Sequence, residues 1–293
     1  MTVSGVCRKM GITRQNYYAR RKVRQRQQVD GGLVAVLVVA ERQLQPRLGT
    51  RKLHLMLQGV LAQQGMVLGR DRFLEVLRAR ELLLAPKLTE YPCTTNSQHS
   101  LPVFTNQIKA LVLSQPNEVW GSDLTYLRTE EGFLYLSLVT DKYSRKVVGY
   151  HCGDTLEAIG CIQALGMALK DLPARSHPIH HSDPGSQYCC HEYVNALAVR
   201  GLKISMTERD HCAENALAER MNGILKSEYG LGERIKTKMQ ARQRVDQGVR
   251  LYNERRPHTA LDYRTPAAAH NSMGPTRSCA TQPPQLKLCL MTM

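Results

Sequence analysis

The stretch Glu118-Val-Trp-Gly-Ser-Asp-Leu-Thr-Tyr-Leu-Arg128 is the segment from which the fold can be worked out. It ends at the polar turn Thr129-Glu-Glu-Gly132, and two further stretches of similar texture follow, Phe133 to Asp141 and Lys146 to Cys152. Apolar runs of this length bounded by short polar turns are typical of strands. The stretch therefore predicts three successive strands of an antiparallel sheet.

Helices and strands alternate after this sheet begins. The first helix is expected to be capped by Thr155, with Glu157 in its first turn. An antiparallel start followed by alternating helices and strands indicates an α/β fold with a mixed five-stranded sheet and flanking helices. The expected elements are a helix over 155–172, a strand near Ile179, a helix over 192–199, a strand over 202–206 and a helix over 213–229.

Positive charge is concentrated in the first part of the chain. The 293 residues carry a formal net charge of +15, and residues 1–110 hold 18 Lys and Arg against 6 Asp and Glu. No acidic residue interleaves with the cluster Arg20-Arg-Lys-Val-Arg-Gln-Arg26, which favours a polyanionic partner over a merely solvated face. Among the basic residues that follow, Arg51, Lys52 and Arg72 are candidate DNA contacts.

The same part of the chain has helical patterns. Residues 4–18 predict two short helices separated near Gly11, the second capped by Thr13, in a helix-turn-helix cadence. Residues 50–84 predict two amphipathic helices separated by Gly65 and Gly69. We expect an all-helical N-terminal DNA-binding region ahead of the sheet.

These patterns divide the chain into six parts. The longest apolar run, Leu33 to Ala40, has eight residues, against the roughly 20 needed to cross a bilayer, so no membrane segment is expected. Near the C-terminus, Arg255 and Arg256 are further candidate DNA contacts. The six parts are basic N-terminal helices at 1–45, a helix-turn-helix-like region at 46–90, a linker at 91–112, an α/β core at 113–230, a C-terminal helix and basic segment at 231–270, and a disordered tail at 271–293.

Three carboxylates lie at positions in the predicted fold where they could bind a metal ion. Asp123 lies inside the first strand, where an unpaired charge costs several kcal/mol. Asp183 follows the fourth strand, at the kind of strand end where ligands bind in open α/β sheets. Glu219 lies on the last helix of the core. Each could instead be an ordinary core, turn or surface acid, but carboxylates that converge from different elements are suited to Mg²⁺.

The last helix adds a geometric argument. At 100° per residue, Asn215, Glu219, Asn222 and Lys226 fall within an arc of about 60°. This stripe would offer one carboxylate, two amides and one cation to whatever lies across from it. Glu214 points about 140° away from Glu219 and is the poorer candidate.

A group of histidines and cysteines could suggest a zinc site, but the spacing of these residues does not favour one. His180, His181, Cys189, Cys190 and His191 could be taken for a zinc site, but adjacent ligands do not match the usual C-x2-4-C or H-x3-5-H patterns. The nine cysteines are scattered along the chain. We therefore expect reduced cytoplasmic thiols.

Taken together, the motifs resemble the retroviral-integrase-type DDE transposases of bacterial insertion sequences, specifically the OrfB product of the insertion-sequence-three group. Thirty-five residues separate Asp183 from Glu219, as in the D,D(35)E signature of that family, and Lys226 occupies its basic position seven residues further on. The segments Trp120-x-x-Asp-x-Thr-Tyr, His181-Ser-Asp-x-Gly-Ser-Gln-Tyr and Tyr252-Asn-x-Arg-Arg-Pro-His258 also match.

The resemblance implies an RNase H-like catalytic core over 113–230 and a DDE-type polynucleotidyl transferase. Its three catalytic acids, Asp123, Asp183 and Glu219, would hold two Mg²⁺ ions, with Mn²⁺ as a substitute, while Lys226 and the amides of Asn215 and Asn222 face the DNA. Implied partners are the insertion-sequence ends, target DNA, an upstream OrfA product or fusion, and further copies of the chain on DNA. The implied location is the bacterial cytoplasm, at the nucleoid.

Two positions depart from the family pattern, and two other functions stay open. Glu214 stands where the family more often has Asp, and Arg47-Leu-Gly-Thr-Arg51 replaces a tyrosine-bearing motif. One alternative is a DNA-binding regulator that has lost catalysis. The other is an RNase H-like nuclease that cuts without joining.

Overall fold

The computed structural model describes residues 2–85, 100–208 and 214–272. Two compact units divide the described chain, one formed by residues up to 44 together with 48–85, the other by 45–47 together with the described part of 100–272. The two units are described separately below. The expected tail beyond 272 and the first part of the expected linker lie outside the described residues.

The first unit is all helical, as predicted. It contains α1 (Val3–Lys9), α2 (Arg14–Leu44), α3 (Thr50–Gln63) and α4 (Arg70–Ala79). The break before α2 is confirmed: Gly11 has a φ of +63°, a conformation that glycine adopts without strain. The Thr13 hydroxyl accepts a 3.1 Å hydrogen bond from the Asn16 backbone N–H.

The expectation that the second helix is short is wrong. Helix α2 has 31 residues, because its C-terminal half supplies apolar residues to a core shared with α3 and α4. Val34 and Val38 are fully buried there, together with Leu53, Phe73 and Leu77. Tertiary packing of this kind outweighs the local helix-breaking tendency of glycine in α2.

The second unit is built on a mixed sheet of order β3-β2-β1-β4-β5. Strands β1, β2 and β3 are antiparallel neighbours, whereas β4 and β5 run parallel to β1. This is the predicted five-stranded mixed sheet. The strands span Val119–Thr129, Gly132–Asp141, Val147–Gly153, Ile179–Ser182 and Ile204–Met206.

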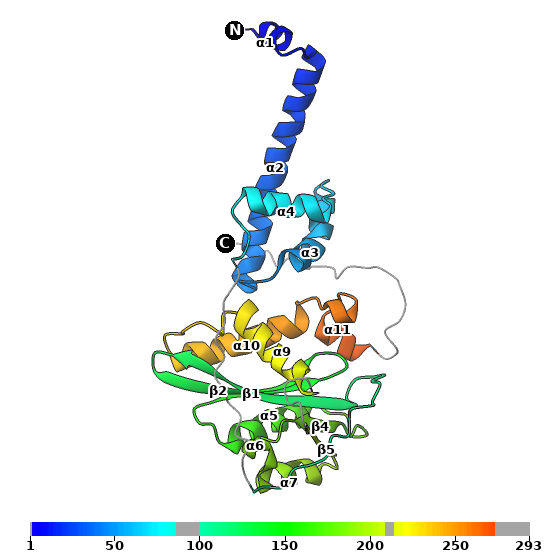
Figure 1. The fold of residues 1–293 in the computed structure, drawn as a ribbon, viewed down its shortest axis with the longest axis vertical. Coiled ribbons are helices and arrows are strands. Elements are labelled where there is room, and N and C mark those ends of the chain that lie inside the picture. The colour runs from blue at the N-terminus through cyan, green and yellow to red at the C-terminus, as the bar shows by residue number, and fades with distance from the viewer. Residues whose placement is uncertain (1, 86–99, 209–213, 273–293) are drawn as a thin grey trace. The chain divides into compact units, whose positions relative to one another are not determined.

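Helices cover both faces of this sheet (Figure 1). On one face lie α5 (Ala158–Lys170), α6 (Ser186–Cys189) and α7 (His191–Val199); on the other lie α9 (Ala216–Glu228) and α10 (Lys238–Glu254), with η1 (Thr259–Leu261) and α11 (Pro266–Asn271) after them. Helix α5 begins three residues later than predicted: Glu157, not Thr155, is its N-cap residue. Helix α9 begins at Ala216, and residue 213 of the predicted helix lies outside the described chain.

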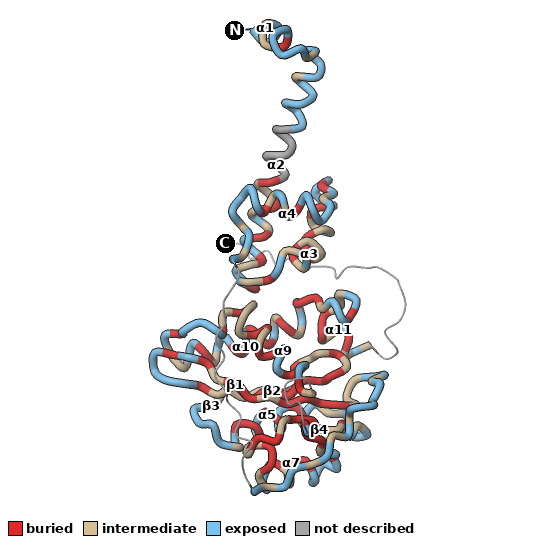
Figure 2. The backbone as a smooth tube through the Cα atoms, viewed as in Figure 1, coloured by how far each residue is buried: buried red, intermediate tan, exposed pale blue. Residues whose placement is uncertain are grey.

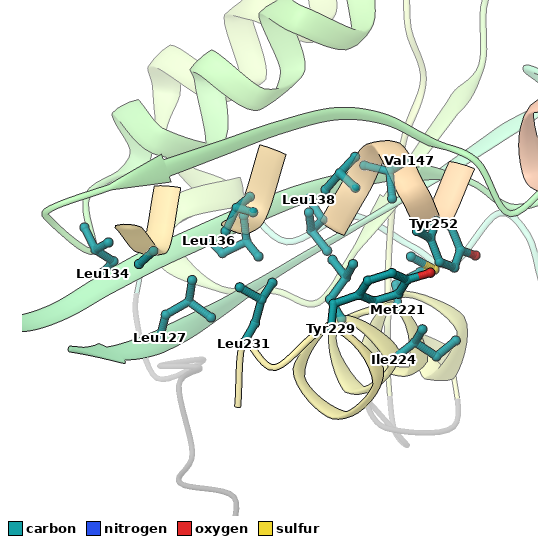
Figure 3. Packing of buried hydrophobic residues seen from close by; sticks show 14 of the residues in the cluster. Leu127, Leu134, Leu136, Leu138, Val147, Met221, Ile224, Tyr229, Leu231 and Tyr252 are labelled. Carbon is teal, nitrogen blue, oxygen red and sulfur yellow. The ribbon is translucent and has the colours of Figure 1, made fainter. Parts of the chain in front are cut away.

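Alternation along the strands produces two separate cores. Leu127 of β1 and Leu136 of β2 face α9 and α10 and pack with Met221 and Tyr252, as Figure 3 shows. Trp120 and the other strand residues whose side chains point to the opposite face of the sheet pack with α5 and α7. The two central strands are therefore buried along most of their length (Figure 2).

Helix α10 also closes the outer edge of the sheet. The Asn253 side chain accepts a 3.0 Å hydrogen bond from the Val147 backbone N–H and donates a 2.9 Å bond to the Val147 carbonyl. The Tyr252 hydroxyl donates to the Arg145 carbonyl, and Arg242 donates to the Cys152 carbonyl. Side chains thus satisfy backbone groups of β3 that would otherwise be exposed on an edge strand.

Candidate active site

Asp123 lies near the middle of β1 on the face covered by α9. Its Oδ1 accepts a 2.9 Å hydrogen bond from the Leu124 backbone N–H, and its Oδ2 accepts a 2.7 Å bond from Asn222 Nδ2. The pairing of β4 with β1 stops at Gly121. The carboxylate therefore sits where the two strands diverge, close to the C-terminal end of β4.

The other two acids approach Asp123 from different elements. Asp183 directly follows Ser182, the last residue of β4, and Glu219 lies in the first turn of α9. Burial, together with the charges of Asp183 and Glu219, raises the pKa of Asp123 to about 7. The structure thus brings the three sequence-predicted acids close enough to influence one another.

This donor set fits a divalent cation. Like-charged carboxylates that share a site hold one another's pKa values up, and a hard cation with oxygen ligands relieves that repulsion. As they stand, no three His, Cys, Asp or Glu side chains within residues 2–85, 100–208 and 214–272 are gathered closely enough to hold an ion.

Lys226 lies beside the acids, two turns after Glu219. Its ammonium donates a 2.5 Å hydrogen bond to the Thr125 hydroxyl and lies 4.5 Å from the centre of the Tyr126 ring. Burial lowers the pKa of Lys226, and the charge of Asp123 partly opposes this effect. Sequence analysis missed Thr125 and Tyr126 as its partners, although both follow Asp123 within three residues on the same strand.

Known proteins resemble this chain over most of its length. Two models described as an integrase core domain match residues 114–212 and 200–266. A 31 kDa uncharacterized protein of insertion element IS600 from Shigella sonnei is 35% identical over 267 residues, which cover 90% of this chain and 96% of that protein. Transposase InsF of insertion sequence IS3A from Escherichia coli (strain K12) is 31% identical over 237 residues, covering 79% and 81%.

The chain belongs to the IS3 group of integrase-core transposases. It is thus a DDE-type polynucleotidyl transferase. Among solved structures, the HTLV-2 integrase catalytic core domain in complex with magnesium is 20% identical, with a TM-score of 0.43, covering 54% of this chain and 98% of that one. A chain from the structure of a simian T-cell lymphotropic virus intasome in complex with PP2A regulatory subunit B56 gamma is 18% identical, with a TM-score of 0.47, covering 84% of this chain and 81% of that one.

Two amides predicted to face DNA in this transposase instead face the protein. Asn222 is 5% exposed and donates to Asp123, and Asn215 is 2% exposed and donates a 3.1 Å hydrogen bond to the Ser122 carbonyl. The stripe of residues predicted from helical periodicity does lie on one side of the helix, but that side faces strand β1. Both side chains therefore tie α9 to the sheet, and their role as DNA contacts stays a prediction.

Arg256 is also held within the protein. Its guanidinium is buried, donates two 2.7 Å hydrogen bonds to the Glu228 carboxylate and lies 2.7 Å from His258 Nε2. A guanidinium held in this way by α9 is not available to a phosphate. Arg255 is half-buried, and its role as a DNA contact stays a prediction.

The helical unit contains three of the basic residues that were predicted to contact DNA. Arg51 and Arg72 are exposed, while Lys52 is half-buried, in the first turns of α3 and α4. Exposed cations at such positions are free to reach a phosphate backbone. Their contribution to DNA binding stays a prediction.

The histidines near the site belong to the protein interior. His180 Nε2 is hydrogen-bonded to the Ser122 and Tyr193 hydroxyls at 2.7 and 2.8 Å, and His181 Nδ1 to the Ser205 hydroxyl at 3.0 Å. Burial lowers the pKa of His180 to about 3 and that of His181 to about 4. Both rings are neutral at pH 7 and link β4 to its neighbours.

Proposed function

We propose that this transposase cleaves the ends of its insertion sequence and joins them to target DNA with Asp123, Asp183 and Glu219 as the catalytic acids. The observation that carries the proposal is the placement of the acids: Asp183 directly follows β4, the parallel neighbour of the strand that holds Asp123, and Glu219 begins the helix whose Asn222 binds Asp123. The three carboxylates would hold two Mg²⁺ ions, for which Mn²⁺ can substitute. Such a pair, when bound, activates an attacking oxygen and stabilises the leaving one.

Two phosphoryl transfers make up the reaction. In the first, a water oxygen attacks the phosphorus at the element's end, the bond to the 3′ oxygen breaks, and that oxygen takes up a proton to become a 3′-OH. In the second, this 3′ oxygen loses its proton and attacks a target phosphodiester, whose own bond to a 3′ oxygen breaks. Lys226 would hold a phosphate near the acids, and Asn222 would keep Asp123 in place.

Partners and location follow from the family. We propose that the chain acts on DNA as a homo-oligomer, with an OrfA-type upstream product or fusion, at the bacterial nucleoid. The simian T-cell lymphotropic virus relative acts in an intasome. No described helix is long and apolar enough to cross a membrane.

Nicking and joining of supercoiled plasmid in Mg²⁺ test this function, because they need no knowledge of the cognate ends. We expect nicked and joined products with the wild type and neither with Glu219→Gln, while both proteins bind DNA equally. Nicking without joining would identify a nuclease instead. DNA binding that is unchanged by Glu219→Gln, with no cleavage by the wild type even in the presence of its upstream frame, would identify a regulator.

A further inference from the structure

Residues 100–112, expected to form part of a linker, are attached to the catalytic unit. Leu101 and Phe104 pack against the core around Trp120. Gln107 donates through its backbone N–H to the Ser205 hydroxyl at 2.9 Å and through Nε2 to the Ile204 carbonyl at 2.9 Å. The segment thus lies along β5, the edge strand of the sheet, and precedes residue 114, where the integrase-core match begins.

Two glutamates connect this segment to the region before α9. The Glu208 carboxylate accepts from the Asn106 backbone N–H at 2.8 Å and from Lys109 Nζ at 2.7 Å. The Glu214 carboxylate accepts from Asn106 Nδ2 at 2.8 Å and from the Glu208 backbone N–H at 2.7 Å, with Lys109 Nζ 3.6 Å away. Asn106 and Lys109 therefore each contact both glutamates.

The start of α9 depends on these contacts. Asn215, its N-cap residue, makes no capping hydrogen bond and instead binds the Ser122 carbonyl on β1. Glu214 is the residue immediately before it, and the hydrogen bond from the Glu208 N–H, together with Asn106 and Lys109, lowers the pKa of Glu214 to about 2. The anchored ionised Glu214 and Asn215 together fix the end of α9 that carries Glu219.

We propose that Asn106 and Lys109 are positioning residues for the reaction, which through Glu208 and Glu214 set the start of α9 and the place of the Glu219 carboxylate relative to Asp123. The inference rests on the proposed function of Glu219 and gives residues upstream of the matched core a part in the active site. It also gives a role to Glu214, which the helical arc excluded from the catalytic face.

A charge reversal with a conservative partner tests the proposal in the full chain. Lys109→Glu places a third carboxylate between Glu208 and Glu214, whereas Lys109→Arg keeps the cation. Asn106→Asp removes the donor to Glu214 and places a further carboxylate beside it. The matched control is Lys238→Glu, because Lys238 also forms a half-exposed ion pair, at 2.8 Å with Asp154, on α10.

Amide hydrogen exchange over residues 216–219 is the readout that needs no catalysis. We expect Lys109→Glu and Asn106→Asp to speed this exchange about tenfold, and Lys109→Arg and Lys238→Glu to leave it unchanged. Unchanged exchange in Lys109→Glu would overturn the proposal. Since Glu219→Gln should exchange like the wild type, the result is independent of whether Glu219 is catalytic.

Cleavage kinetics provide the second readout. We expect Lys109→Glu to lower kcat about tenfold and to raise the Mg²⁺ concentration needed for half-maximal rate, with KM for DNA unchanged. A raised KM with unchanged kcat would overturn the proposal and make Lys109 a DNA contact. If the wild type is inactive but the exchange result holds, the proposed function fails while the positioning of α9 stands.

Discussion

Asn222 Nδ2 donates a 2.7 Å hydrogen bond to Oδ2 of Asp123 and so joins the helix of the third acid to the strand of the first. Asn222 comes three residues after Glu219 on α9, which is close to one helical turn. The bond thus ties the position of the Asp123 carboxylate to that of α9. It also lowers the pKa of Asp123 against the effect of burial.

Replacing Asn222 with Leu should move the acid limb of the pH–rate profile to higher pH. The hydrogen bond stabilises the ionised form of Asp123, so its loss raises the pKa of that carboxyl. We expect the cleavage rate at pH 7 to fall at least tenfold, with partial recovery at pH 9. Single-turnover cleavage across this range measures the shift, and a uniform loss at every pH would contradict the role given to Asn222.

Substitution of Asp123 by Asn should stabilise the metal-free protein at alkaline pH. The pKa of Asp123 is raised from 3.8 to about 7. Between about pH 4 and pH 7 this carboxyl is therefore ionised in the unfolded state but protonated in the folded state, so the wild type loses stability as the pH rises through this range. Three pK units at about 1.4 kcal/mol each set the upper limit. Because Asn accepts one hydrogen bond fewer, we expect a net gain of about 1–3 kcal/mol.

Urea unfolding in EDTA at pH 5 and pH 8 measures this effect. The gain in free energy of unfolding should appear at pH 8 and be lost or reversed at pH 5, because about two of the three pK units of wild-type destabilisation develop only above pH 5. Added Mg²⁺ should stabilise the wild type at pH 8 and leave the variant unchanged. An Asp123→Asn variant that is less stable than the wild type at both pH values would refute the argument.

The sheet and the family were predictable because both leave patterns in the sequence itself. Strand alternation and polar turns specified β1, β2 and β3, and the spacing of Asp183 and Glu219 identified the family. The partners of Asn215 and Asn222 were not predictable. Helical periodicity tells which residues share a face, but only the packing of α9 on β1 shows that the facing surface is protein rather than DNA.

Which of the charged residues are buried could not be predicted from the sequence either. Arg255 and Arg256 are adjacent in one basic segment, yet only Arg256 is enclosed, because Glu228 at the end of α9 supplies a carboxylate to pair with it. Likewise, the length of α2 is set by a core shared with helices that follow it in the chain. Contacts between residues far apart in sequence determine both features.

Arg256→Ala should therefore destabilise the protein rather than weaken DNA binding. Removing one member of a buried ion pair leaves the other uncompensated and costs about 3–5 kcal/mol. Glu228 is 17% exposed, so we expect a loss near the lower end of that range. Arg244→Ala is the control, because Arg244 is exposed on α10, and it should change stability by less than about 0.5 kcal/mol. Chemical denaturation compares the two, and equal effects would contradict the assignment.

Lys226 is a cation of α9 that lies near enough to Asp123 to feel its charge. Its ammonium rests on Thr125 and Tyr126, and a phosphate bound there would lie within reach of Asp123. Neutralising one phosphate releases condensed counterions, so Lys226→Gln should reduce the slope of log K against log salt by about 0.9. The loss should be similar for every DNA sequence, because a phosphate contact carries no base information.

Salt titrations of DNA binding, with Lys238→Gln as control, decide whether Lys226 contacts DNA. Lys238 is paired with Asp154 on α10, so its substitution should leave the salt slope unchanged. Lys226→Gln also retains the hydrogen bond between Asn222 and Asp123, so stabilisation by Mg²⁺ should persist in it. An unchanged slope combined with reduced stability would show that Lys226 serves only to pack against Tyr126, and the phosphate would then have to be held by other cations.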